Sequence, residues 1–221
     1  MWNDVRLAAR LLLKERWFSV AAVSALALGI GANVTIFTVV NAAMLRDVPI
    51  DGADRMLVLT TEKISSARAQ PGGLSYREFL EWQAGGRTFD AIAGHLDVEM
   101  NVAGDPQPPV RVEGSFVSAN TFSLIGERPV AGRDFRPDDD RPGAEPVVLI
   151  GHALWTSRYG GDGGVVGRVI RVNGTKVTVI GVMREGFGFP QVAEIWQPLS
   201  QVSESVKNDR TMRPIVGVGR M

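Results

Sequence analysis

The stretch GRVIRVNGTKVTVIGVM, residues 167–183, carries the clearest structural signal in the chain. Asn173 and Gly174 separate two runs in which apolar and polar residues alternate. These two residues suit a type I′ turn, because both central positions of that turn need a positive φ. The stretch therefore predicts a β-hairpin with one face in a core and the other in water. The residues expected opposite each other are Ile170 with Val177, on the apolar face, and Arg171 with Lys176, on the polar face.

Further strand-like segments lie on both sides of this hairpin. They are short, rich in β-branched residues, and alternate in polarity or form brief apolar runs. The last one reaches the final residue with no closing turn, so we expect it to lack a sheet neighbour. The expected strands cover residues 55–61, 108–118, 145–151, 193–199 and 213–221.

Helical segments fall between these strands. Ser75 is a candidate N-cap, and the apolar residues that follow it recur mostly at helical spacing. The expected helices cover residues 75–83, 87–95, 119–126 and 152–160. Helices and strands mixed in this way predict an α+β domain for residues 46–221.

Composition limits the possible functions of the chain. Its 221 residues include 24 basic and 24 acidic side chains, so the formal net charge is zero. Proteins that bind nucleic acid need a basic surface to displace counterions from phosphates, so nucleic acid is not an expected partner. The chain has no cysteine, which excludes disulfides, thiolate zinc sites and cysteine nucleophiles.

Residues 17–45 contain no ionisable side chain. A helix needs about 20 residues to cross the hydrocarbon layer, so this segment predicts one transmembrane helix. The alternative is a signal peptide with VNA at 40–42 as its cleavage site, although such apolar regions run about 7 to 15 residues. Cations concentrate before the segment, which predicts a cytoplasmic amino terminus and places residues after 46 outside the cell membrane.

Residues 1–16 have apolar side chains at helical spacing and basic side chains largely away from them. This pattern predicts a cytoplasmic amphipathic helix lying on membrane lipid. A simple extension of the spanning helix fits the same residues.

Small and amide side chains form a ridge along one face of the predicted span. They recur at intervals of four, interrupted by Phe37, and comprise Ala21, Ala25, Gly29, Asn33 and Asn41. Small residues let helix backbones approach closely in lipid, and buried amides can bond across the contact. The ridge predicts packing against other membrane helices, although glycine is common in membrane helices and a chance alignment remains open.

The sequence offers little catalytic or ligand-binding chemistry. The two histidines, His95 and His152, stand in unrelated segments, so neither a metal site nor a catalytic base is indicated. Residues 136–143, RPDDDRPG, lack the ligand spacing of a calcium loop and indicate a solvated turn. Residues 160–167, GGDGGVVG, lack the lysine and hydroxyl residue of a phosphate-binding loop. We predict no catalytic, metal or cofactor site, and hence no enzyme.

Four blocks of the sequence occur in the order found in one known family. They are LALGIGANVTIFTVVNAAMLRDVP, SYREFLEWQ with RTFDAIAG, VEGSFVSANTFSLIGERPVAGRDF, and the long block from Pro146 to Pro190. Together they resemble the MacB-type permeases of the FtsX-like superfamily of ABC transporters. Within that superfamily, the duplicated orphan permeases first noted in acidobacteria are the most similar.

The resemblance implies a permease of the bacterial inner membrane. The chain would be its N-terminal part: an amphipathic helix over 1–16, a transmembrane helix over 17–45, and a periplasmic core domain over 46–221 that is incomplete at its C-terminal end. A separate cytoplasmic ATPase would bind ATP and magnesium, and its motion would drive conformational change outside the membrane. Other permease helices, or a second permease copy, would be further partners.

Two other classes of protein share parts of this pattern. A membrane-tethered extracytoplasmic binding module would have the same topology without needing the small-residue ridge. A membrane-anchored hydrolase would need a nucleophile beside a base, for which only the two histidines are available.

Overall fold

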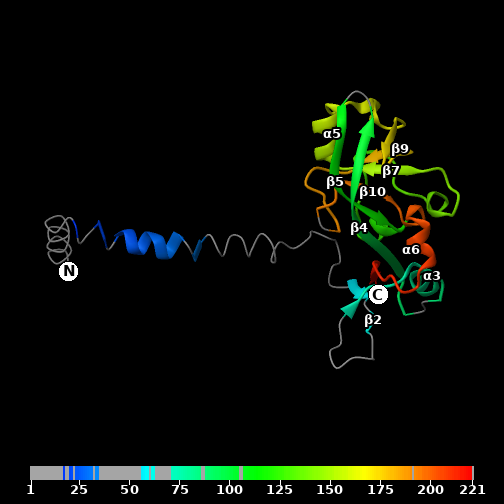
Figure 1. Cartoon of the computed structure of the whole chain (residues 1–221), viewed down its shortest axis with the longest axis horizontal. Helices are drawn as coiled ribbons and strands as arrows, with labels where there is room; N and C mark the ends of the chain where they lie inside the picture. The colour runs from blue at the N-terminus through cyan, green and yellow to red at the C-terminus, as the bar shows by residue number, and fades with distance from the viewer. Residues whose placement is uncertain are drawn as a thin grey trace. The chain divides into compact units, whose positions relative to one another are not determined.

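A computed structural model of the chain contains two compact units, Met1–Val48 and Pro49–Met221. In the first unit, the described residues between 17 and 34 are helical, and the second unit contains all the described strands (Figure 1). The residues that the structure describes are 17, 20–21, 23–31, 33–34, 56–59, 61–62, 71–85, 88–104, 107–190 and 192–220.

The expected hairpin is present as β8 (Val169–Val172) and β9 (Thr175–Val182). Asn173 and Gly174 have φ values of 49° and 84°, as a type I′ turn requires. Ile170 pairs with Val177 and Arg171 pairs with Lys176, which confirms the predicted register. Ile170 and Val177 are buried, whereas Arg171 and Lys176 are exposed.

Six strands close into a ring that contains this hairpin. Four of them are β4 (Ala91–Gly104), β5 (Gln107–Val117), β7 (Val147–Ile150) and β10 (Ile195–Pro198). Hydrogen bonding runs from β4 to β5, β10, β7, β9, β8 and back to β4. Within this ring the β5–β10 and β7–β9 pairs are parallel and the others antiparallel. The expected strands at 108–118, 145–151 and 193–199 are therefore confirmed.

All six ring strands contribute to one apolar cluster. Two further segments, α5 (His152–Tyr159) and η3 (Gly163–Val165), add Leu154, Tyr159 and Val165 to it. The helix α5 confirms the prediction for residues 152–160, and it ends at Gly160 in the left-handed conformation that suits glycine. The buried strand residues of the cluster include Met100, Val112, Val148, Ile170, Val177 and Ile195.

The first residues of β4 belong to a second, open part of the sheet. There β11 (Val216–Arg220) pairs antiparallel with β4 on one edge and with β1 (Met56–Leu59) on the other. The terminal strand thus has neighbours on both sides, and the expectation that it lacks one is wrong. It was wrong because β1 comes from a distant part of the chain, and sequence pattern does not reveal which strands pair.

The helix α3 (Tyr76–Gly85) covers one face of this open sheet (Figure 1). Ser75 and Glu78 cap it reciprocally: the Ser75 N–H donates to Glu78 Oε2 at 2.9 Å, and the Glu78 N–H donates to Ser75 Oγ at 3.4 Å. Phe79 is buried beneath Gly94 of β4, where a Cβ would come within 2.5 Å of the Phe79 ring. The N-cap predicted at Ser75 is confirmed.

The helix predicted over residues 87–95 does not form, because β4 begins at Ala91. Leu96, Val98, Met100 and Val102 alternate with polar residues in the strand, which is 14 residues long in all. Pairing with β11 extends the N-terminal end of the strand into residues whose own β-propensity is weak. Tertiary pairing therefore overrides the helical spacing of the apolar residues.

A further core forms where β10 meets the segment between β5 and β7. Trp196 is fully buried there, beside Phe122 of α4 (Thr121–Leu124), the short helix predicted within 119–126. The remaining described elements of the outer unit are β2 (Thr61–Glu62), β3 (Pro71–Gly72), β6 (Ala131–Gly132), η2 (Pro137–Asp140), η4 (Leu199–Gln201) and α6 (Glu204–Asn208).

Candidate functional site

The predicted packing ridge lies in the first unit. Ala21, Ala25, Gly29 and Asn33 are helical and exposed, and a Cβ placed on Gly29 would meet no atom within 4 Å. Asn41, together with residues 1–16, lies outside the described residues. None of the helices formed by the described residues has the length and hydropathy needed to cross a bilayer. The spanning helix, the ridge contacts and the boundaries at 16 and 45 stay predictions.

The structure does not bring the two histidines together. His95 lies on β4, mostly buried, with Nδ1 3.4 Å from Asp97 Oδ1 and its ring against Phe189. His152 begins α5 and contacts the ring of Trp155. Within the described residues, no three histidine or acidic side chains are grouped closely enough to hold a metal ion.

The acidic turn over 136–143 has a structural role that the sequence did not reveal. Asp139 pairs with Arg133 at 2.6 Å. Asp140 accepts hydrogen bonds from the N–H groups of Ala119 at 3.0 Å and Ser200 at 2.7 Å. Asp140 therefore joins the segment before α4 to η4, and burial raises its pKa. The prediction of a solvated turn holds for exposed Asp138 but is wrong for Asp140.

Asp134 is the most strongly perturbed carboxyl group near this turn. Burial raises its pKa to about 6, although the N–H of Phe135 donates to Oδ1 at 2.7 Å and Arg133 lies nearby. Compared with the unfolded chain, the folded protein thus favours the protonated form of the Asp134 carboxyl group. Its contribution to stability is present below the unfolded pKa of 3.8 and is lost as the pH rises through 6.

We expect Asp134→Asn to stabilise the folded chain at pH 7.5, because the neutral amide removes a partly buried charge and can still accept from Phe135. The free energy of unfolding should rise by about 1.5 kcal/mol at that pH, after allowance for partial exposure. Urea unfolding at pH 3.5 should show almost no gain. An equal gain at both pH values, or a loss at pH 7.5, would contradict the assignment of this charge.

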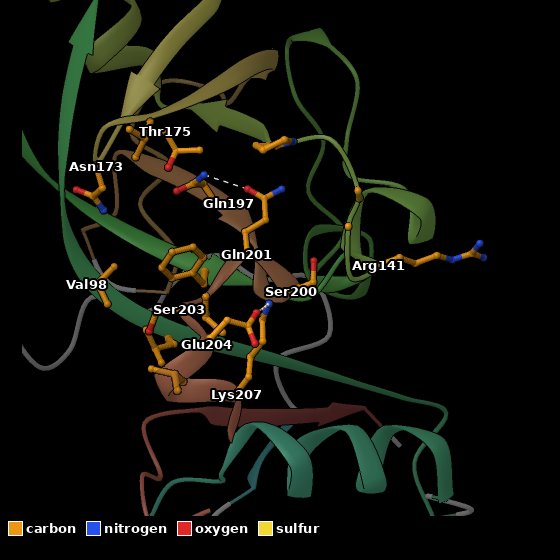
Figure 2. A pocket seen from close by; sticks show the side chains of 18 of the residues that line it. Val98, Arg141, Asn173, Thr175, Gln197, Ser200, Gln201, Ser203, Glu204 and Lys207 are labelled. Atoms are coloured by element: carbon orange, nitrogen blue, oxygen red, sulfur yellow. Dashed lines mark hydrogen bonds and ion pairs between the residues drawn. The ribbon is translucent and has the colours of Figure 1, made fainter. Parts of the chain in front are cut away.

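The outer unit contains a hollow of about 610 Å³ at one rim of the six-stranded ring (Figure 2). The rim is formed by the ends of β5, β8 and β10, the starts of β7 and β9, and the middle of β4. The segment from η4 to α6 lies along one side of the hollow. Its ring-strand lining is Leu96, Val98, Glu99, Phe116, Val172, Thr175 and Gln197, with Pro146 just before β7.

Two glutamine side chains face each other in this hollow (Figure 2). Gln197 Nε2 donates to Gln201 Oε1 at 3.0 Å, and Gln197 is only 6% exposed. The buried Nε2 of Gln201 has no hydrogen-bond partner among the described residues. This pair was not predicted from the sequence. The signal was Gln197, a polar residue among the apolar residues of IWQPL, 195–199, because a buried polar side chain needs a specific partner.

Comparison with known proteins identifies the domain. The family model for the MacB-like periplasmic core domain matches residues 19–217, most of the chain. The chain therefore belongs to the MacB-like periplasmic core domain family, which confirms the resemblance drawn from its sequence. This is the family of the periplasmic domains of MacB/FtsX-type ABC transporter permeases.

Solved structures share the fold at low sequence identity. The periplasmic region of MacB from Actinobacillus actinomycetemcomitans is 14% identical, with a TM-score of 0.57 over 75% of this chain and 73% of that one. A domain of a putative permease protein from Porphyromonas gingivalis is 12% identical, with a TM-score of 0.56 over 79% and 76% of the two chains.

A third structure with this fold is the extracellular domain of the noncanonic ABC-type transporter YknZ from Gram-positive bacteria. It is 15% identical, with a TM-score of 0.54 over 75% of this chain and 83% of that one. No curated protein matches the chain. These three solved domains share their fold with this chain.

Proposed function

We propose that the chain is the N-terminal part of an ABC transporter permease subunit, which couples a separate cytoplasmic ATPase to conformational change of a periplasmic domain. The observation that carries this proposal is the continuous family match from residue 19 to 217. It includes both the apolar segment and the outer unit. The permease would reside in the bacterial inner membrane, acting in export or in transmitting mechanical work.

The charge and exposure of the first unit support the membrane placement. Arg6, Arg10, Lys14 and Arg16 precede the apolar segment, which favours a cytoplasmic amino terminus. The described helical residues expose large apolar side chains, including Trp17 at 90% and Leu28 at 74%. Such side chains are costly in water and favourable in lipid. Residues 17–45 are thus proposed to span the membrane, with residues after 46 in the periplasm.

The energy for this motion would come from a partner protein. The glycine-rich segment 160–167 has no lysine followed by serine or threonine, the pair that positions phosphates and magnesium in a Walker loop. ATP and magnesium are therefore assigned to the partner ATPase. A single helix cannot shield a polar route through hydrocarbon, so further permease helices or a second permease copy are also required.

The test is ATP hydrolysis and ATP-driven motion, measured on the chain alone and in a complex with a full-length permease and its ATPase. The isolated chain should hydrolyse no ATP. In the complex, ATP should change hydrogen exchange in the outer unit, whereas ATP added without the ATPase should not. ATP hydrolysis or export by the isolated chain would overturn the proposal.

The ridge on the first helix gives a second expected result. Gly29→Leu should weaken assembly with other permease helices about fivefold, because the larger side chain prevents close backbone approach. Crosslinking in lipid nanodiscs measures the assembled fraction. Ala27→Leu makes a similar change away from the ridge and serves as the matched control. Equal effects of the two substitutions would count against packing through the ridge.

A further inference from the structure

The hollow at the rim of the ring has the size and position of a ligand site. Binding pockets in proteins enclose about 300 to 1,000 Å³ and often lie where strands of a closed sheet end. This hollow, at about 610 Å³, falls within that range. Leu96, Phe116 and Val172 give it apolar walls, while the glutamine pair places amide groups between them (Figure 2).

The glutamine pair leaves one strong donor group unused. Gln197 is held in place because its Nε2 donates to Gln201 Oε1. Gln201 Nε2 has no acceptor among the described residues, and a buried donor without an acceptor is costly. Gln201 is one of the residues that line the hollow. A ligand with a carbonyl oxygen would then satisfy a donor that the protein leaves unpaired.

The charges around the hollow favour a neutral ligand. Glu204 pairs with Lys207 at 2.8 Å, and Glu99 pairs with Arg111. Arg141 extends away from the hollow and pairs with Asp138 at 2.9 Å (Figure 2). Each charged side chain that lines the hollow therefore has an opposite charge beside it. A charged ligand would lose hydration without gaining an uncompensated partner.

We propose that this hollow binds an uncharged, apolar peptide segment. Its side chains would contact Val98 and Phe116, and a backbone carbonyl would accept a hydrogen bond from Gln201. A side-chain amide matches a peptide group, because each offers one carbonyl acceptor and at least one N–H donor. The inference does not depend on the proposed coupling role, because binding is measured without an ATPase.

The experiment uses the full chain in detergent and a pool of capped pentapeptides made from glycine, alanine, valine, leucine and phenylalanine. Two matched pools carry one glutamate or one lysine in each peptide, and maltotriose serves as a neutral sugar. Equilibrium dialysis measures retention, and NMR of side-chain amides reports on Gln197 and Gln201. The neutral pool should be retained most strongly and should shift both amide signals.

Two variants locate the bound peptide. Gln201→Leu should weaken retention about fivefold to tenfold, as expected for the loss of one buried hydrogen bond. Thr175→Trp, at an exposed rim position, should block the hollow and abolish retention without disturbing the core. Gln107→Leu changes an exposed glutamine of β5 outside the hollow and should leave retention unchanged.

Three results would overturn the proposal. They are no retention of the neutral pool at millimolar concentration, stronger retention of a charged pool or of maltotriose, or equal retention by the parent chain and the Thr175→Trp variant. Thermal unfolding of each variant confirms that the chain remains folded. Because no ATPase is present, failure here leaves the permease proposal standing, and failure of the ATP experiment leaves this one standing.

Discussion

Trp196→Ala is expected to lower the free energy of unfolding of the outer unit by about 4 kcal/mol. Trp196 is fully buried, and its indole N–H donates to the carbonyl oxygen of Phe189 at 2.7 Å. Its ring lies 5.8 Å from that of Phe122 and 5.5 Å from that of Phe187. Alanine would leave a large cavity and an unpaired carbonyl group at the centre of this core.

The position of Trp196 makes the loss difficult to relieve. Its strand β10 is paired on both edges, in parallel with β5 and antiparallel with β7. The surrounding backbone therefore cannot collapse into the cavity without breaking strand pairs. Urea unfolding followed by near-ultraviolet circular dichroism measures the change.

Trp82→Ala provides the matched control, because it removes the same side chain from a partly exposed position. Trp82 lies on α3 and is 38% exposed. Its replacement should cost about 1 kcal/mol, since less apolar surface leaves a buried environment. Similar losses for the two variants would show that Trp196 is not a central core residue.

The sequence was sufficient to predict those parts of the fold that are formed by residues close together along the chain. The hairpin at Asn173 and Gly174 has the turn and register predicted, because both follow from positive φ and alternation of residues. The cap at Ser75 is also a local feature. Closure of the ring was not predictable, because pairs such as β4 with β8 join segments distant in sequence. The same limitation explains the two wrong predictions, a helix over 87–95 and a terminal strand that lacks a neighbour.

The same distinction applies to the candidate site: features within one helix could be predicted, whereas features formed by several distant segments could not. The ridge could be predicted from residues at intervals of four along one helix, and it stays a prediction. The hollow could not be predicted, because its lining combines several strands of the ring with the η4–α6 segment. Gln197 and Gln201 are only four residues apart, but their role depends on the neighbouring strands that enclose them.

The second large effect is expected at Asp140, where Asp140→Ala should lower the free energy of unfolding by about 3 kcal/mol. Its carboxylate accepts from the backbone N–H groups of Ala119 and Ser200. Alanine would leave both donors unpaired in partly buried surroundings. Asp140→Asn keeps one acceptor oxygen and should therefore lose less stability. Urea unfolding at pH 7.5 measures both changes.

Asp138→Ala is the matched control for Asp140, because it removes a neighbouring carboxylate that is exposed. Asp138 pairs with exposed Arg141, and loss of this surface pair should cost under about 0.5 kcal/mol. If Asp140→Ala were as stable as Asp138→Ala, the Asp140 carboxylate would not connect η4 to the segment before α4. A loss that is largest for Asp140→Ala, intermediate for Asp140→Asn and smallest for Asp138→Ala would instead trace the stability to the two backbone hydrogen bonds.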